Sequence, residues 1–209
     1  MSSSGQQPSK WSSTTVIERQ LRPSLQDQGV AFFMTNYVHK GVGSFRGFQE
    51  YLPSLYREEG YRAALSTVIT AAGLASLSNA AKQPAVGASA RQMYLAALRM
   101  VSEALADPLQ VKSDQTLAAV MLLGLFEVRV CPHFTFSKLI LLLEAVSCGG
   151  REAMKSSSME SWRHHIRGVA QLVNIRGPDQ FKSEGSLRLF LQIRRLIVRT
   201  LLIHISNCY

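Results

Sequence analysis

The fold class is decided by residues 159–178, MESWRHHIRGVAQLVNIRGP. Large apolar and aromatic residues recur here every three or four positions, the spacing that places side chains on one face of an α-helix. A glycine followed by a proline ends the pattern, as is typical of a helix C-terminus. We therefore predict an amphipathic helix over about 159–175. Its inner face is expected to carry Trp162, His165, Ile166, Val169, Leu172 and Val173.

The same spacing recurs on both sides of this segment. Further helices are expected over about 24–39, 61–77, 88–106, 114–128 and 186–204, with a short turn near Pro53. The alanine-rich 61–77 segment indicates close helix contacts, and the 114–128 segment is apolar on nearly all sides, with Asp114 as its expected N-cap. Strand patterns are weak. The sequence predicts one all-α domain of stacked antiparallel helix pairs, either a helical bundle or an irregular α-α superhelix.

Length and composition agree with one globular domain. The 209 residues (23.1 kDa) are 46% hydrophobic and 18% charged, enough for a single sizeable core. Three scattered cysteines indicate free thiols in a reducing compartment rather than a disulfide framework. Residues 1–23 are expected to be a disordered leader, without the apolar segment of a secretory signal. The apolar run 134–146 is too short to cross a bilayer, so no membrane partner is expected.

The charge is unevenly distributed. Of the 23 Lys and Arg residues, ten lie in 151–209, where only four of the 14 acidic residues are found. A basic 151–199 face leaves open a small adaptor protein that binds nucleic acid directly. However, Arg163 and Arg167 are an i, i+4 pair on the polar side of the predicted 159–175 helix, which favours a solvated face. The basic residues concerned are Arg151, Lys155, Arg163, Arg167, Arg176, Lys182, Arg188, Arg194, Arg195 and Arg199.

Catalytic and metal-binding motifs are missing from the sequence. No Gly-x-Ser-x-Gly elbow and no P-loop is present, so we expect no enzyme and no cofactor. The nearest metal-ligand pattern is Cys131-Pro-His133 with His164 and His165 further along. Adjacent histidines on a helix point about 100° apart and cannot chelate one ion as an i, i+4 pair does. We therefore predict no metal site.

Arg194 falls among the apolar positions of the predicted 186–204 helix. A buried guanidinium requires a partner, and Glu127 is the expected one. The alternative is an arginine that holds an anionic ligand. The apolar stripe of this helix is expected to comprise Leu187, Phe190, Leu191, Ile197, Val198, Leu201 and Leu202.

The sequence resembles the regulatory (middle homology) region of fungal zinc-cluster transcription factors, in the group with the second type of fungal-specific domain. The resemblance is strongest over 162–178 and extends, more weakly, over about 25–200. Upstream it includes AFFMTNYV and LAAVMLLGLFEV (117–128). The matching motif residues are Trp162, His165, Gly168, Leu172, Arg176, Gly177 and Pro178, followed by Leu189, Phe190 and Arg194.

The resemblance implies a nuclear, non-catalytic regulatory domain in RNA polymerase II transcription, with the cytoplasm possible for a short form. Its partners would be co-regulators or full-length relatives, with homo- or heterodimers possible and DNA reached only indirectly. The motif residues would be architectural rather than catalytic. Trp162 would anchor the core, Gly168 would allow a close helix approach, and Arg176 to Pro178 would stop the helix.

The chain departs from the family pattern in two ways. Family members carry an N-terminal six-cysteine cluster that holds two zinc ions and binds DNA, whereas the first cysteine here is Cys131. We therefore expect a partial, C-terminally truncated regulatory domain over 24–205 without its own zinc cluster. An atypical insertion is expected at about 129–157. Residues 129–147 are interpreted either as a retained intron or as a genuine insertion with an extra helix over 139–146.

Overall fold

A computed structural model describes residues 23–39, 49–130 and 157–206. Its elements are all helices, so the predicted all-α class is confirmed, and the predicted helices match within a few residues at their ends. The predicted leader and insertion lie almost wholly outside the described residues. In chain order the elements are α2 (Leu25–Tyr37), α3 (Leu52–Arg57), α4 (Arg62–Ala81), α5 (Pro84–Ala106), η1 (Gln110–Lys112), α6 (Asp114–Val130), α8 (Ser157–Arg176), η2 (Gly177–Phe181) and α9 (Glu184–Ser206).

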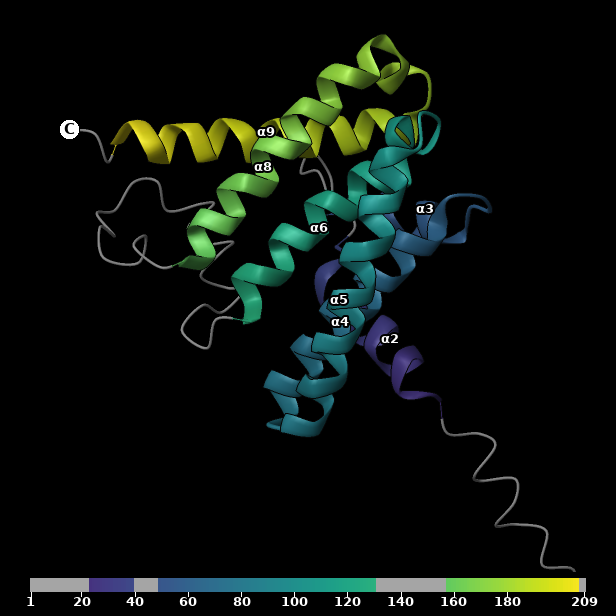
Figure 1. The fold of residues 1–209 in the computed structure, drawn as a ribbon, viewed down its shortest axis with the longest axis vertical. Helices are drawn as coiled ribbons and strands as arrows, with labels where there is room; N and C mark the ends of the chain where they lie inside the picture. The colour runs from purple at the N-terminus through teal and green to yellow at the C-terminus, as the bar shows by residue number, and fades with distance from the viewer. Residues whose placement is uncertain (1–22, 40–48, 131–156, 207–209) are drawn as a thin grey trace, which may run out of the picture.

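Helices α4 and α5 form an antiparallel hairpin, against which α2 and α6 pack (Figure 1). The turn is two residues long because Lys82 adopts a left-handed conformation (φ 52°) and its N–H donates to the carbonyl of Ser78. Pro84 then begins α5, where its fixed φ suits the first helical turn and its missing N–H is not needed. Helix α2 and helix α6 also contact α4.

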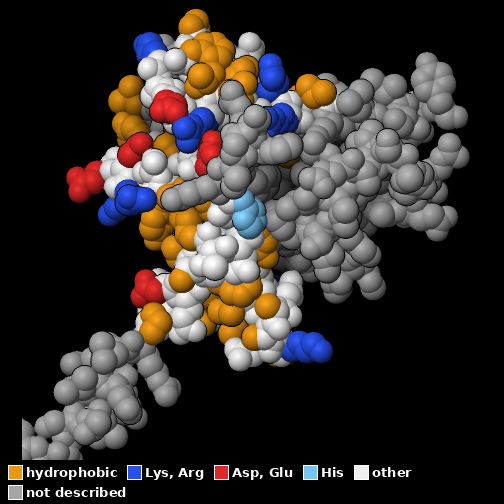
Figure 2. Space-filling view, turned by 180° about the vertical axis from the view of Figure 1, so that it is seen from behind, with side chains coloured by type: hydrophobic (Ala, Val, Ile, Leu, Met, Phe, Trp, Pro, Cys, Tyr) orange, Lys and Arg blue, Asp and Glu red, His pale blue; other side chains and the backbone are white. Residues whose placement is uncertain are grey.

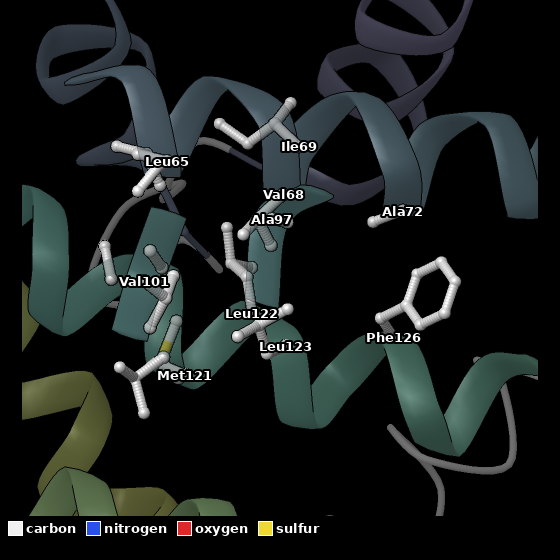
Figure 3. Packing of buried hydrophobic residues seen from close by; sticks show 14 of the residues in the cluster. Leu65, Val68, Ile69, Ala72, Ala97, Val101, Met121, Leu122, Leu123 and Phe126 are labelled. Atoms are coloured by element: carbon white, nitrogen blue, oxygen red, sulfur yellow. The ribbon is translucent and has the colours of Figure 1, made fainter. Parts of the chain in front are cut away.

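The hydrophobic core lies between α4, α5 and α6 (Figure 3). Leu65 and Ile69 of α4 are fully buried, as are Ala97 of α5 and Leu122 of α6. Among the described helices, only α4 is long and apolar enough to cross a membrane by length and composition. The most apolar 18 residues of α4 are 61% buried inside the protein, and the contacts of α4 with α2, α3, α5 and α6 account for its apolar character.

Glycine allows α2 and α4 to touch backbone to backbone. A Cβ atom built on Gly73 would lie 1.9 Å from the carbonyl oxygen of Gly29, and one built on Gly29 would lie 2.8 Å from Cγ of Leu74. Real Cβ atoms do not approach other atoms so closely, so only glycine fits at position 73 with α2 in this place. The close helix contacts predicted for the alanine-rich segment are thereby confirmed.

Helix α5 buries its small residues rather than its leucines. Ala90, Ala97 and Val101 are buried, whereas Leu95 and Leu105 are 55% and 41% exposed. Helical spacing predicts an inner face with Tyr94, Leu95, Leu98, Val101 and Leu105, which is confirmed at Val101 and wrong at Leu95 and Leu105. Alanine at the contact allows α5 to lie close to α4, and a leucine there would hold the two helices apart.

Helices α8 and α9 cross each other and pack on α6 (Figure 1). The expected face of α8 is confirmed at Ile166, Val169 and Leu172, which are all buried. The face of α9 is not as predicted.

Helix α9 buries Leu189, Ile193 and Leu196, whereas Leu187 and Val198 are 39% and 48% exposed. Apolar residues occur around much of this helix, so helical spacing alone fits more than one inner face. The face that packs is the one that also carries Ser186, whose contact with α6 is described below. The predicted stripe was therefore rotated away from the true one.

Candidate functional site

A buried ion pair joins three helices at one end of the domain. Arg176, the last residue of α8, pairs with Asp114, the first residue of α6. Their side chains are only 4% and 16% exposed. The second oxygen of the same carboxylate accepts a hydrogen bond from the Ser186 hydroxyl in the first turn of α9. One aspartate thus links the C-terminus of α8 and the N-terminus of α9 to the start of α6.

Local capping leaves Asp114 available for this role. Ser113, not Asp114, caps α6, since its Oγ accepts the backbone N–H of Thr116 at 3.1 Å. The expected N-cap was therefore wrong by one residue. At the first helical position the carboxylate still benefits from the positive end of the helix dipole. Its side chain is then directed toward Arg176 and Ser186 instead of its own backbone.

The Arg-Gly-Pro segment both ends α8 and places the arginine. Helix α8 ends at Arg176, and Gly177 takes φ 58°, a left-handed conformation that costs other residues about 1–2 kcal/mol. The chain continues through η2 to Ser183, whose Oγ accepts the N–H of Ser186 at 3.0 Å and so caps α9. This short connection brings Arg176 and Ser186 to the same carboxylate.

Two further contacts attach the segment before α4 to this junction. The backbone N–H of Gln49 donates to Oε1 of Gln192 on α9 at 2.9 Å. The side chain of Gln115 on α6 donates to the Glu58 carboxylate at 3.1 Å. Helix α3 is therefore held between α6 and α9, beside the Arg176–Asp114 pair.

Several buried polar atoms of this region have no hydrogen-bond partner among the described residues. They are Nε and Nη1 of Arg176, Oε1 of Gln180, Oε1 of Gln49 and Nε2 of Gln192. An unsatisfied buried donor or acceptor costs about 1–3 kcal/mol. The junction therefore holds three helices in position, but its unsatisfied polar atoms lower the stability of the domain.

Tyr51 is a buried titratable residue close to the junction. Its hydroxyl is buried and donates to the sulfur of Met121 at 3.7 Å. Burial, and secondly the negative charge of Asp114, raises the pKa of the Tyr51 phenol above its ordinary value of about 10. Folding therefore favours the neutral phenol, and this stabilisation is present below about pH 10 and is lost as the pH rises further.

Tyr51→Phe should reduce the alkaline loss of stability. We expect a small change in unfolding free energy near pH 7, because the hydrogen bond that the hydroxyl donates to sulfur is a weak one. Above about pH 10 the variant should keep more stability than the parent, since it has no phenol that ionises more readily in the unfolded state than in the folded one. Urea unfolding across this pH range checks the prediction. Tyr61→Phe, at a 41% exposed tyrosine, is the control and should behave like the parent.

Residues 16–204 match the family described as fungal specific transcription factor domain. The chain belongs to this family. The match covers most of the sequence and includes all the described helices except the last residues of α9. No curated protein and no solved structure matches the chain. The resemblance identified from residues 162–178 and its neighbours is thus confirmed.

The motif residues of this fungal transcription factor domain do not form one cluster. Leu172 is buried, Arg176 lies in the ion pair, Gly177 ends the helix and Pro178 is exposed in η2. His165 is half-buried on α8, and His164 is exposed. The Trp162 side chain lies outside the described residues, so its expected role as core anchor stays a prediction.

Two roles expected for motif residues are corrected. No described atom lies within 4 Å of a Cβ built on Gly168, so no close helix approach is seen there. Arg194 is exposed on α9 rather than buried, so it needs no internal partner, and the side chain of Glu127 lies outside the described residues. The buried guanidinium of this fungal transcription factor domain belongs to Arg176 instead.

Sequence reasoning missed that Asp114 pairs with Arg176 and accepts a hydrogen bond from Ser186. These contacts of Asp114 span 62 and 72 residues. No local pattern relates them, and Asp114 also resembles a capping residue. Within residues 23–39, 49–130 and 157–206, no three His, Cys, Asp or Glu residues gather as a metal site. The Cys131-Pro-His133 segment, from which no metal site was predicted, lies outside those ranges.

Proposed function

We propose that the chain is a non-catalytic regulatory domain that acts in RNA polymerase II transcription, in the nucleus, through contacts with other proteins. Membership of the fungal transcription factor domain family is the observation that carries this proposal. The 209 residues contain three cysteines, whereas a two-zinc cluster requires six. These residues therefore have no zinc cluster with which to bind DNA. Co-regulators or full-length relatives are the proposed partners, with homo- or heterodimers included.

The described surface favours this proposal over direct nucleic-acid binding. Arg176 is buried against Asp114, and Arg188 is held by Glu184 and by Glu50, which lies 3.6 Å away. Two of the ten residues assigned to the basic face are therefore neutralised by carboxylates. Figure 2 shows basic side chains mixed with acidic and apolar ones on the face that it presents. A phosphate-binding surface is expected to be more uniformly basic.

A tethering experiment tests the proposed function. The chain is fused to a heterologous DNA-binding domain and directed to a reporter promoter in a fungal host. We expect reporter transcription to rise or fall relative to the DNA-binding domain alone. The Asp114→Ala variant, destabilised as argued in the Discussion, should weaken the effect. Reporter output equal to that of the DNA-binding domain alone, with the fusion present in the nucleus at the same level, would contradict the proposal.

A further inference from the structure

Helix α9 exposes an apolar column to solvent on the side opposite its packed face. With about 100° per residue, Leu187, Leu191 and Val198 lie within about 40° of one another around the helix axis. Leu187 and Val198 are 39% and 48% exposed, and Leu191 is half-buried. The core-facing residues of the same helix are Leu189, Ile193 and Leu196. Helix α9 therefore has two apolar faces, and only one of them is buried in the core of the domain.

Exposed arginines border this column on both sides. Arg194 lies beside Leu187 around the axis, and Arg195 lies on the far side of Leu191, by the same 100° geometry. Both side chains are exposed, and neither has an acidic partner among the described residues. Arg188, about two turns before Arg195, already has Glu50 and Glu184. Two uncompensated positive charges therefore flank the apolar residues.

An exposed aromatic residue of η2 packs against α9 next to this column. Phe181 is 52% exposed, and its ring meets that of Phe190 edge-on, with centroids 5.1 Å apart. Phe190 lies on the Arg194 side of α9. We call Phe181, Leu187, Leu191, Arg194, Arg195 and Val198 the α9 face. Clustered exposed apolar residues of this kind mark protein interaction sites.

We propose that the α9 face binds an amphipathic helix with acidic residues beside its apolar ones, supplied by a protein co-regulator. The apolar column would receive the apolar stripe of such a helix, and its carboxylates would pair with Arg194 and Arg195. Arginine and aromatic residues beside a desolvated apolar contact are typical of strong interface positions. The inference rests on the proposed function and names the chemistry of its partner.

Charge argues against the two other occupants. In a two-fold dimer formed through this face, the arginines of one copy would meet those of the other, because such an interface pairs the same surface with itself. Nucleic acid would use the arginines through its phosphates, but would leave the leucines and valine exposed or pair them with a charged backbone. An acidic amphipathic helix complements both parts of the surface.

The test measures binding of a defined probe to the full chain. The probe is a fluorescein-labelled peptide with Leu and Phe at i, i+3, i+4 and i+7 and Asp and Glu between them. One control peptide has the same composition in scrambled order, and another has Asn and Gln in place of the acids. Fluorescence anisotropy should show binding of the first peptide, with at least about tenfold weaker binding of either control.

Variants of the chain locate the binding site. We expect Leu187→Gln with Val198→Gln to weaken binding about tenfold or more, and Arg194→Gln with Arg195→Gln to weaken it severalfold and to reduce its salt dependence. The matched control is Leu95→Gln with Arg99→Gln, which changes an exposed leucine and an exposed arginine on α5. It should bind like the parent. Circular dichroism checks that each variant is folded.

Four outcomes would overturn the inference. They are no binding by the parent, equal binding by the scrambled peptide, loss of binding in the α5 control alone, and self-association that the α9 variants abolish. Tight binding of a DNA duplex that depends on Arg194 and Arg195 but not on Leu187 and Val198 would assign the face to nucleic acid instead. If reporter activity is found without peptide binding, only this inference fails. If the peptide binds without reporter activity, the proposed function fails.

Discussion

Replacing Gly73 with alanine is expected to destabilise the domain by about 3 kcal/mol or more, the upper end of the range for overpacked cores. The added Cβ would lie 1.9 Å from the carbonyl oxygen of Gly29. Both atoms belong to or are fixed by backbone, so no side-chain rotation relieves the contact. Helix α2 would have to move away from α4, which would loosen the packing around the buried Phe33.

Gly168→Ala is the matched control for this experiment. Gly168 also lies inside a helix, but no described atom is within 4 Å of the added Cβ. Alanine should therefore stabilise α8 by about 0.5–1 kcal/mol, because it loses less backbone entropy on folding. Urea unfolding followed by circular dichroism measures both variants. Equal urea midpoints of unfolding for the two alanine variants would contradict the close contact between Gly73 of α4 and Gly29 of α2.

The second large effect is expected for Asp114→Ala, at about 3–5 kcal/mol. The substitution leaves the Arg176 guanidinium, whose side chain is 4% exposed, without its only described acidic partner. It also removes the acceptor of the Ser186 hydroxyl. An uncompensated buried charge is more costly than the loss of an exposed pair, since water cannot solvate it.

A double-mutant cycle separates the ion pair from simple loss of volume. Asp114→Leu combined with Arg176→Met should be much less destabilising than the sum of the two single changes, because the double variant buries no lone charge. Glu184→Ala serves as the surface control. Glu184 is 77% exposed in its pair with Arg188, so its loss should cost no more than about 1 kcal/mol. Additive single changes at positions 114 and 176 would refute the coupling.

Helical periodicity was sufficient to predict the all-α fold class and the approximate ends of most helices. It also gave the packed face of α8, where apolar and polar residues are clearly segregated at Ile166, Val169 and Leu172. It gave the wrong face for α9, where apolar residues occur on two sides of the helix. The side that packs also carries Ser186, whose contact with Asp114 connects distant parts of the chain. Local spacing contains no information about such a partner.

The lack of long-range information in local spacing also explains why the wrong arginine, Arg194 rather than Arg176, was predicted to be buried. Arg194 has apolar neighbours in the sequence and was expected to be buried, yet it lies on the exposed side of its helix. Arg176 stands beside a glycine and a proline and was interpreted only as part of a helix stop. Its burial follows from the position of α6, whose first residue supplies the carboxylate. A helix terminus can thus carry a buried charge that its own segment does not reveal.

The glycine contact between α2 and α4 has a consequence for how this domain diverges among species. Position 73 should accept no residue but glycine for as long as α2 keeps its place, and a larger residue at position 29 should be accompanied by a change at Leu74, whose Cγ it would meet. Position 168, by contrast, belongs to the most distinctive motif of the chain but has room for a methyl group. Natural variation is therefore expected to be tightest at a glycine outside the motif, and substitutions near it should arise in coupled pairs.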